Sequence, residues 1–185
     1  EFMAALMSSV MDNVTKFSEY ILTCRQIMGI PILPPDINEG ESGFSVSGNA
    51  IRYGLSAIKS VGKSVVDTII ADRESGGPFR SMEDFVGRMT HKEVNKRTLE
   101  NFIKSGALDT LKQKIAVMPV LLESKARERK SVIEGQLSLF DIAGEEERDN
   151  FQITFPEVGE YTKEELLVFE KEILGVYISG HPLED

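Results

Sequence analysis

Short helical runs that stop at glycine or proline constrain the fold of this chain most strongly. Residues 3–14 and 13–28 place apolar side chains at three- and four-residue spacing, the period of an amphipathic helix. Gly29 and the prolines beyond it do not continue that helix. The same pattern recurs downstream, in runs at 63–75, after Ser81, after Asn95, at 112–130, and at 162–174 after Thr162. The sequence therefore predicts a mainly α fold built from short helices.

Two further stretches predict a small β component. Residues 30–38 contain three prolines, which lack an amide donor and disfavour helix in the preceding residue, so this stretch is predicted to be extended. Residues 44–46 and 51–53 alternate apolar and polar side chains on either side of a turn signal at 47–50. This arrangement predicts one short β-hairpin. Residues 176–178 are expected to begin a further strand.

Charge is unevenly distributed along the chain. Overall, 21 Lys and Arg against 30 Asp and Glu give a net charge of −9. Residues 51–114 carry 12 Lys and Arg against 8 Asp and Glu, whereas residues 134–185 carry 3 against 14. A basic middle within an acidic chain suggests one region that meets phosphate and another that stays solvated. Residues 141–160 lack periodicity and are predicted to form an acidic, partly disordered linker.

The chain offers few residues for disulfides, metal ions or catalysis. Its single cysteine cannot form an internal disulfide, and its two distant histidines lack the spacing of metal ligands. No apolar run approaches the ~20 residues of a membrane-spanning helix. These features suit a cytoplasmic protein. The acidic side chains of the basic region are scattered and do not form a set that holds two catalytic metal ions, namely Asp67, Asp72, Glu83 and Asp84.

The strongest candidate for a binding motif is segment 58–66. Two helical segments are predicted to flank a tight turn at Gly62, and the free N–H groups that begin the second helix favour an anion. Lysines and hydroxyls at the turn suit a DNA phosphate, so the predicted contacts with duplex DNA are Lys59, Ser60, Val61, Gly62, Lys63 and Ser64. The segment resembles the helix-hairpin-helix motif, although Ser60 stands where the usual Gly-hydrophobic-Gly hairpin has its first glycine. The alternative is a plain helix N-cap in a packed α domain.

A nucleotide-binding P-loop does not fit the same segment. Gly62-Lys63-Ser64 matches the end of that motif, but Ala57 stands where its first glycine is required.

A second basic group surrounds the predicted helix that follows Asn95. It contains His91 and Lys92, and three cations that are predicted to contact phosphates: Lys96, Arg97 and Lys104. No aromatic residue is interleaved with these cations, which disfavours stacking on single-stranded bases. The alternative is a solvated helix face.

A five-residue apolar motif follows the basic helical stretch 112–130. Gln136, Leu137, Ser138, Leu139 and Phe140 lie between Gly135 and an acid-rich region, with little core of their own to join. The motif resembles the peptide by which bacterial polymerases and repair proteins bind the ring-shaped sliding clamp. Leu139 and Phe140 would be its anchors, and Gln136 its polar contact. The alternative is a buried turn between helices.

Taken in order, these motifs resemble the family of bacterial replicative DNA polymerase III alpha subunits. The resemblance covers essentially the whole chain. It is carried by Glu1–Ser9, Gly29-Ile30, Leu33–Asn38, Arg52–Lys59, Asn95–Arg97, Ile103–Asp109, the pentapeptide and Leu174–Leu183. It implies that the chain is a fragment of a longer subunit. The expected divisions are the end of the polymerase fingers (1–42), a helix-hairpin-helix domain (43–112), a connecting helix (113–133), a clamp-binding motif (134–142), an acidic linker (143–160) and a helix leading toward an OB domain (161–185).

The resemblance also implies an enzyme whose chemistry lies elsewhere. A DNA-directed DNA polymerase would use Mg²⁺ in a palm outside this chain, and the chain itself is not expected to bind a cofactor or to be active alone. The expected partners are the sliding clamp, double-stranded DNA and the remainder of the polymerase, but no membrane. Two alternatives are a clamp-tethered repair or ligation protein with a helix-hairpin-helix module, and an interaction scaffold without nucleic acid. A third, a self-sufficient small enzyme, lacks a catalytic set.

Overall fold

Short helices and a small sheet form the part of the chain that the computed structural model describes, residues 1–89, 94–111 and 161–180. These residues lie within one compact unit, Glu1–Gln113 with Tyr161–Asp185; the second unit, Lys114–Glu160, is outside the described residues. The helices are α1 (Phe2–Ser9), α2 (Val14–Leu22), the π-helix η1 (Thr23–Ile27), the 3₁₀ turn η2 (Leu55–Ala57), α3 (Lys63–Gly76), α4 (Met82–Met89), α5 (Lys96–Lys104), the 3₁₀ turn η3 (Asp109–Leu111) and α8 (Lys163–Leu174). The prediction of a mainly α fold is confirmed.

The predicted β-hairpin is present and has a third strand beside it. Strands β2 (Ser45–Ser47) and β3 (Ala50–Arg52) pair antiparallel around Gly48, whose φ is +61°. Strand β1 (Ile32–Leu33) pairs parallel with β3, with Ile32 opposite Ile51. Strand β1 comes from the proline-rich stretch that was predicted only to be extended. The sequence did not predict this pairing, because a parallel partner is not marked by a local turn.

Helix starts follow the predicted capping residues. Asn95 accepts a hydrogen bond from the Thr98 N–H at 2.9 Å, and Ser81 accepts one from the Asp84 N–H. Thr162 and Glu165 form a reciprocal capping box at the start of α8. Each cap satisfies a backbone donor that has no partner within its own helix. The predicted starts of α4, α5 and α8 are confirmed.

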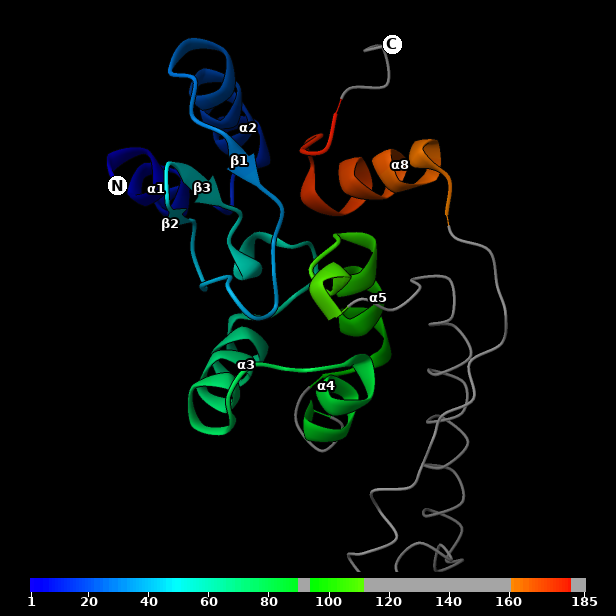
Figure 1. Ribbon diagram of the computed structural model, residues 1–185. Helices are drawn as coiled ribbons and strands as arrows, with labels where there is room; N and C mark the ends of the chain where they lie inside the picture. Colours follow the sequence, from blue (N-terminus) through cyan, green and yellow to red (C-terminus); the bar gives the residue numbers. More distant parts are fainter. Residues whose placement is uncertain (90–93, 112–160, 181–185) are drawn as a thin grey trace, which may run out of the picture. The chain divides into compact units, whose positions relative to one another are not determined.

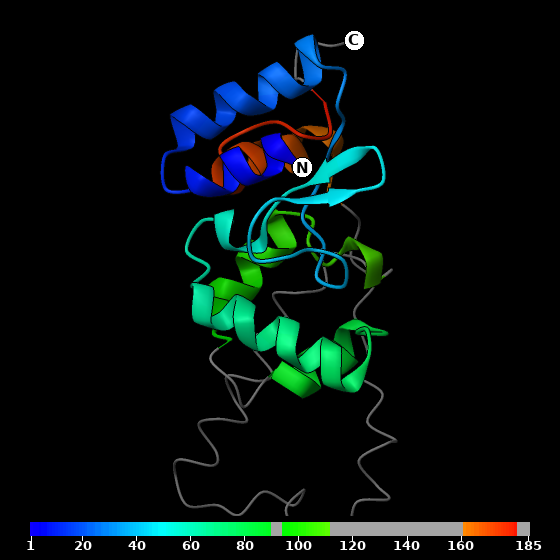
Figure 2. The same ribbon diagram turned by 90° about the vertical axis from the view of Figure 1, so that its left-hand side faces the viewer.

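Two aromatic clusters mark the core. Phe17, Phe44 and Tyr53 contact one another with ring centroids 4.8–6.1 Å apart, joining α2 to the sheet. Phe85 of α4 contacts Phe102 of α5 at 6.4 Å and Phe79 at 5.0 Å. Figures 1 and 2 show α5 between α4 and α8, with α1, α2 and the sheet at the same end of the unit as α8, and α3 beside α4 at the opposite end. Helices α5 and α8 thus pack together although 58 residues separate their facing ends.

The C-terminal end of α8 is fixed by contacts with distant parts of the chain. The buried Tyr53 hydroxyl donates to the Leu174 carbonyl at 2.9 Å. Burial raises the pKa of Tyr53 above its ordinary value, so the hydroxyl stays a donor. Gly175 ends the helix with φ +76°, and a Cβ there would lie 2.6 Å from Cγ1 of Val14. The helix end is therefore pressed closely against α2.

Residues 176–178 do not form the strand that was expected. The Glu170 carboxylate accepts hydrogen bonds from the Ile178 N–H at 2.9 Å and the Ser179 N–H at 3.1 Å, and also from the Ser179 hydroxyl. Backbone donors that a strand would use for pairing are satisfied here by a buried side chain. The expected strand at 176–178 is wrong, because it was inferred from apolar side chains alone and these do not reveal that Glu170 binds the backbone donors.

The apolar face predicted for residues 13–28 ends earlier in the structure than expected. Phe17, Ile21 and Cys24 are buried, as predicted, whereas Ile27 is 80% exposed and Met28 is 49% exposed. The π-helical winding of η1 adds a residue to the turn and changes which side chains face inward. The predicted 112–130 helix and 141–160 linker lie outside the described residues. None of the described helices has the length and apolar composition that crossing a membrane requires.

Replacing Tyr53 with phenylalanine tests the contact that fixes the end of α8. The Tyr53→Phe variant leaves the Leu174 carbonyl without its donor, so we expect unfolding free energy to fall by about 1 kcal/mol. Urea unfolding followed by circular dichroism measures the change. Tyr20→Phe is the matched control, because Tyr20 is only half-buried. Equal stability of the two variants would show that the hydrogen bond from Tyr53 to the Leu174 carbonyl does not stabilise the fold.

Candidate nucleic-acid interface

The predicted helix-hairpin-helix segment forms a tight turn that leads into α3. One 3₁₀ turn, η2, precedes it, so the first helical segment is shorter than predicted. The Val61 N–H donates to the Ile58 carbonyl at 3.1 Å and closes the turn, and Gly62 is the N-cap of α3. Ser60 has φ +59° and is the one non-glycine residue with positive φ within residues 1–89, 94–111 and 161–180. This is the position where the usual motif has glycine, and the backbone keeps the glycine conformation.

Apolar and polar residues of the turn face opposite ways. Ile58 and Val61 are 2% and 7% exposed and anchor the turn in the core. The residues between and after them are exposed, namely Lys59, Ser60, Gly62, Lys63 and Ser64. Gly62 brings no capping side chain, and the Val65 N–H donates to the Gly62 carbonyl at 3.1 Å. Within the described part of the chain, the Lys63 and Ser64 N–H groups at the start of α3 are therefore left open to a ligand. The turn therefore presents donors and cations to solvent, as a phosphate site requires.

Lys63 is already paired within its own helix. Its Nζ lies 2.7 Å from Oδ2 of Asp67, one turn along α3. Both side chains are mostly exposed, at 72% and 51%, and such a pair contributes little to stability. A DNA phosphate can therefore take the place of Asp67 without a large loss. The four-residue spacing of Lys63 and Asp67 is the signal in the sequence that could have predicted this pair.

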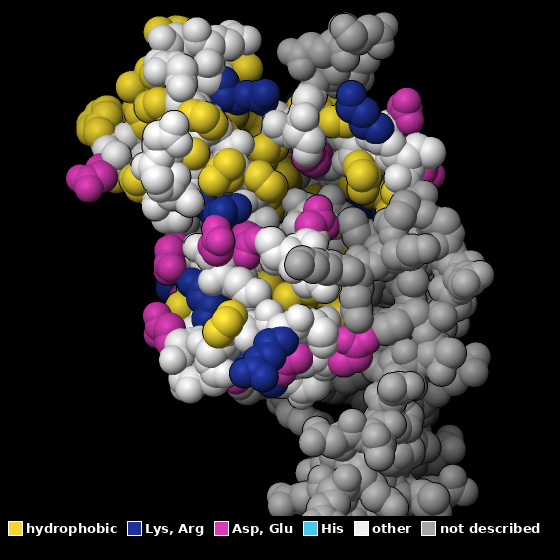
Figure 3. Space-filling view, in the orientation of Figure 1, with side chains coloured by type: hydrophobic (Ala, Val, Ile, Leu, Met, Phe, Trp, Pro, Cys, Tyr) yellow, Lys and Arg dark blue, Asp and Glu magenta, His cyan; other side chains and the backbone are white. Residues whose placement is uncertain are grey.

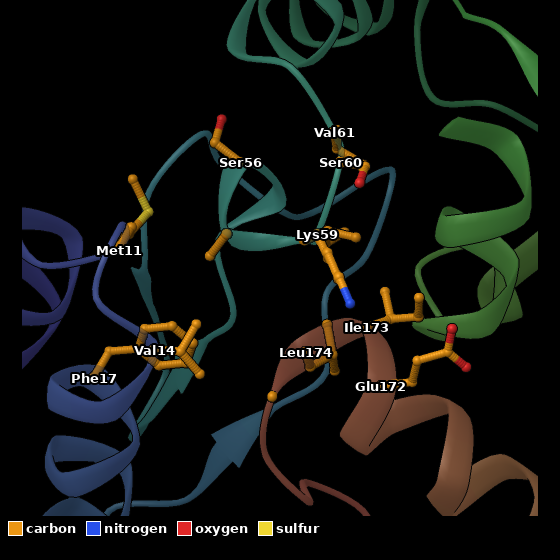
Figure 4. A pocket seen from close by; sticks show the side chains of 13 residues that line it. Met11, Val14, Phe17, Ser56, Lys59, Ser60, Val61, Glu172, Ile173 and Leu174 are labelled. Atoms are coloured by element: carbon orange, nitrogen blue, oxygen red, sulfur yellow. The ribbon is translucent and has the colours of Figure 1, made fainter. Parts of the chain in front are cut away.

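Lys59 lies at the edge of a pocket beside the turn. The pocket, about 420 Å³ and open to solvent on one side, is lined by the α2 N-terminal region, residues 56–61 and the C-terminal turn of α8. In Figure 4, Lys59 extends from the hairpin toward the end of α8, which also carries Glu172. An anionic ligand at Lys59 would thus meet one acidic side chain nearby.

The backbone of Lys59 is held on both sides by residues from other elements. Its N–H donates to the Ile173 carbonyl at 3.1 Å, and its carbonyl accepts a hydrogen bond from Nδ2 of Asn101 at 2.6 Å. Sequence reasoning missed both partners. Nothing local marks Asn101 or Ile173 as neighbours of Lys59, because they lie 42 and 114 residues farther along the chain.

Asn101 also brings the second basic group toward the hairpin. Arg97 precedes Asn101 by four residues and Lys104 follows it by three, spacings that place side chains on neighbouring parts of one helix face. Arg97 is exposed, whereas Lys96 lies 3.8 Å from Glu100. Lys104 Nζ lies 5.4 Å from the centre of the Phe169 ring, so Lys104 also has a structural role. His91 and Lys92 lie outside the described residues.

The sequence of this chain is similar to a known motif family and to known proteins. Residues 29–116 match the model of the helix-hairpin-helix motif. The chain is 41% identical over 186 residues to DNA polymerase III subunit alpha of Thermus aquaticus, covering 99% of this chain and 15% of that protein. It is 37% identical over 190 residues to the same subunit of Chlamydia muridarum, covering 100% of this chain and 15% of the relative.

This chain is a relative of one segment of DNA polymerase III subunit alpha. It spans about 15% of the length of those two curated relatives. The expected resemblance is therefore confirmed, and so is the presence of a helix-hairpin-helix domain. The match to the helix-hairpin-helix model ends at residue 116, and α8 lies beyond it.

The pentapeptide Gln136, Leu137, Ser138, Leu139 and Phe140 lies outside the described residues. No group of three or more potential metal-ligating side chains occurs among the residues whose positions are described.

Replacing Ser60 with glycine tests whether the left-handed backbone conformation at this position is strained. A non-glycine residue with positive φ is strained, so Ser60→Gly should raise the unfolding free energy by about 0.5–1 kcal/mol despite the added freedom of the unfolded chain. Thermal and urea unfolding measure the change. Ser75→Gly is the control, because Ser75 lies within helical α3 and the same substitution should destabilise there. A loss of stability at position 60 would exclude a strained turn.

Proposed function

We propose that this chain is the part of replicative DNA polymerase III alpha that binds the backbone of duplex DNA without sequence preference. One observation carries the proposal: an exposed turn with positive φ at Ser60 leads into an uncapped helix N-terminus between two lysines. Free N–H groups and cations at one point suit a phosphate oxygen, and phosphate contacts carry no base information. Similarity to the polymerase along the whole chain supports the same reading.

The proposed contacts are those of the turn and of the α5 N-terminal region. The turn supplies Lys59, Ser60, Gly62, Lys63 and Ser64. Val61, which was also predicted as a contact, has a buried side chain, and its N–H already donates to the Ile58 carbonyl, so we propose that it shapes the turn. Helix α5 supplies Lys96, Arg97 and, more weakly, Lys104. On the face drawn in Figure 3, basic and acidic side chains are interspersed rather than separated by sign. Affinity for DNA should therefore be modest and strongly dependent on salt.

The second part of the proposal concerns the sliding clamp. The segment 136–140 would place Leu139 and Phe140 in an apolar pocket of the clamp, with Gln136 in a polar one. A duplex held by the hairpin and encircled by the clamp is bound at two points, which raises effective concentration and so processivity. From the same similarity to the polymerase subunit, we propose that residues 1–185 divide into the end of the fingers, the helix-hairpin-helix domain, the connecting helix, the clamp-binding motif, the acidic linker and the last helix, with the bounds given in the sequence analysis. In the parent enzyme, DNA synthesis with Mg²⁺ would occur in another part of the polymerase, in the cytoplasm.

A clamp-tethered repair or ligation protein would share both motifs. Similarity to the polymerase subunit covers 99–100% of this chain, including the first 40 residues, which such a protein would not need. No observation favours that alternative over the polymerase.

Reversing the two hairpin lysines tests the DNA contact. We expect the Lys59→Glu, Lys63→Glu variant to bind duplexes of any sequence at least about tenfold more weakly, and to reduce the slope of log K against log salt by about 1–2, since each lost phosphate contact removes about 0.9. Fluorescence anisotropy at several salt concentrations measures both quantities. Lys16→Glu with Lys163→Glu is the matched control, because it makes the same charge change at exposed positions of α2 and α8. Equal losses in both pairs would show only a net-charge effect.

Removing the two apolar anchors tests the clamp contact. Leu139→Ala with Phe140→Ala should abolish binding to the sliding clamp, because a few buried apolar side chains supply most of such a peptide's affinity. Surface plasmon resonance with immobilised clamp measures this, and duplex binding should not change. Ile153→Ala with Phe155→Ala serves as control in the neighbouring segment. Retention of the clamp by the Leu139, Phe140 variant would overturn this part of the proposal.

A further inference from the structure

The two hydrogen bonds of the Lys59 backbone lie next to the strained residue of the hairpin. Lys59 immediately precedes Ser60, whose positive φ a non-glycine residue adopts only when surrounding contacts enforce it. The local turn supplies one such contact, from the Val61 N–H to the Ile58 carbonyl. The other contacts come from Asn101 of α5 and Ile173 of α8. The conformation of the hairpin thus depends on two elements outside it.

Helix α8 can act as a firm support because its end is itself fixed. The last carbonyls of a helix have no partner within the helix. Here the Ile173 carbonyl accepts from Lys59 and the Leu174 carbonyl accepts from Tyr53. The Lys171 ammonium donates to the Gly175 carbonyl at 3.0 Å, and Glu170 binds the backbone that follows. The acceptor that faces Lys59 therefore has a defined position.

Asn101 provides the matching support from the other side. It is 7% exposed, in the middle of α5, and its Nδ2 donates to the Lys59 carbonyl. A buried asparagine is costly unless it is hydrogen-bonded, and this bond satisfies it. At 7% exposed, Asn101 has little surface to offer DNA. Any effect it has on DNA binding must act through Lys59 and Ser60.

We propose that Asn101 and the C-terminal turn of α8 are positioning parts of the duplex-binding site. They hold the Lys59 backbone so that Ser60 keeps its left-handed conformation and the donors of the turn converge on one phosphate. Helix α8 lies outside residues 29–116, which match the helix-hairpin-helix model, yet it completes the hairpin. The inference rests on the proposed function, because it concerns the same DNA contact.

A merely structural role for Asn101 predicts a different result. Loss of the bond would then lower stability, but molecules that remain folded would bind DNA as before. A positioning role lowers the affinity of folded molecules, and it does so only while the hairpin lysines are present to be positioned.

The test measures duplex binding by the whole 185-residue chain at 10 °C and low salt, with circular dichroism of each sample to show that it is folded. We expect Asn101→Ala to weaken binding about fivefold to tenfold, the effect of one lost hydrogen bond. In the Lys59→Glu, Lys63→Glu background the same substitution should change affinity by less than about twofold, since coupled residues are not additive. Tyr53→Phe, which loosens the end of α8, should weaken binding by a smaller factor.

Asn38→Ala is the matched control. Asn38 also joins distant backbone, donating to the Phe79 carbonyl at 2.9 Å, but it does not touch the hairpin. It should lower stability and leave affinity unchanged. Wild-type affinity in a folded Asn101→Ala variant overturns the inference, as does an equal loss in Asn38→Ala. If Asn101→Ala does not fold, the Tyr53→Phe measurement decides, and its wild-type affinity overturns the inference.

Failure of the proposed function looks different. If the wild-type chain does not bind duplex, or if the lysine reversals do not weaken binding, the DNA site itself is wrong. If the reversals weaken binding and Asn101→Ala does not, only the positioning role is wrong.

Discussion

The carbonyl groups at the C-terminal end of α8 are the acceptors on which the arrangement of the site depends. A helix leaves its last carbonyls unpaired, and this chain uses two of them to join parts that lie more than 110 residues apart. The Leu174 carbonyl fixes Tyr53, which belongs to the aromatic cluster beside the sheet. The Ile173 carbonyl fixes Lys59, the first cation of the hairpin. Core and candidate interface therefore share one support.

Local signals in the sequence predicted the helices and their starts well. Asn95, Ser81 and Thr162 cap where expected, since a cap depends only on residues three positions away. The β2–β3 hairpin was predicted for the same reason. Strand β1, the exposed Ile27 and the missing strand at 176–178 were not predicted correctly. Each depends on winding or on a distant partner, such as the Glu170 carboxylate, that residue spacing does not encode.

The candidate site shows the same division. The turn at 58–66 was predicted from its glycine, lysines and small residues, and the structure places those residues together. The deviation at Ser60 does not open the turn, because the backbone adopts the left-handed conformation regardless of the side chain. The contact between Asn101 and Lys59 could not be predicted, since nothing in the sequence distinguishes a buried asparagine of an amphipathic helix from an exposed one. The pairing of Lys63 with Asp67 shows that a cation counted from the sequence is not always a free one.

The close packing and left-handed backbone at Gly175 make this position sensitive to substitution. The backbone there is left-handed, which strains any residue with a side chain, and an added Cβ would lie 2.6 Å from Cγ1 of Val14, so the Val14 side chain would have to shift. The neighbouring carbonyls are those that hold Tyr53 and Lys59. A side chain at position 175 would therefore disturb the supports of the candidate interface without altering any charged residue. A substitution at Gly175 is therefore expected to lower the unfolding temperature of the chain, although residue 175 itself lies outside the candidate interface.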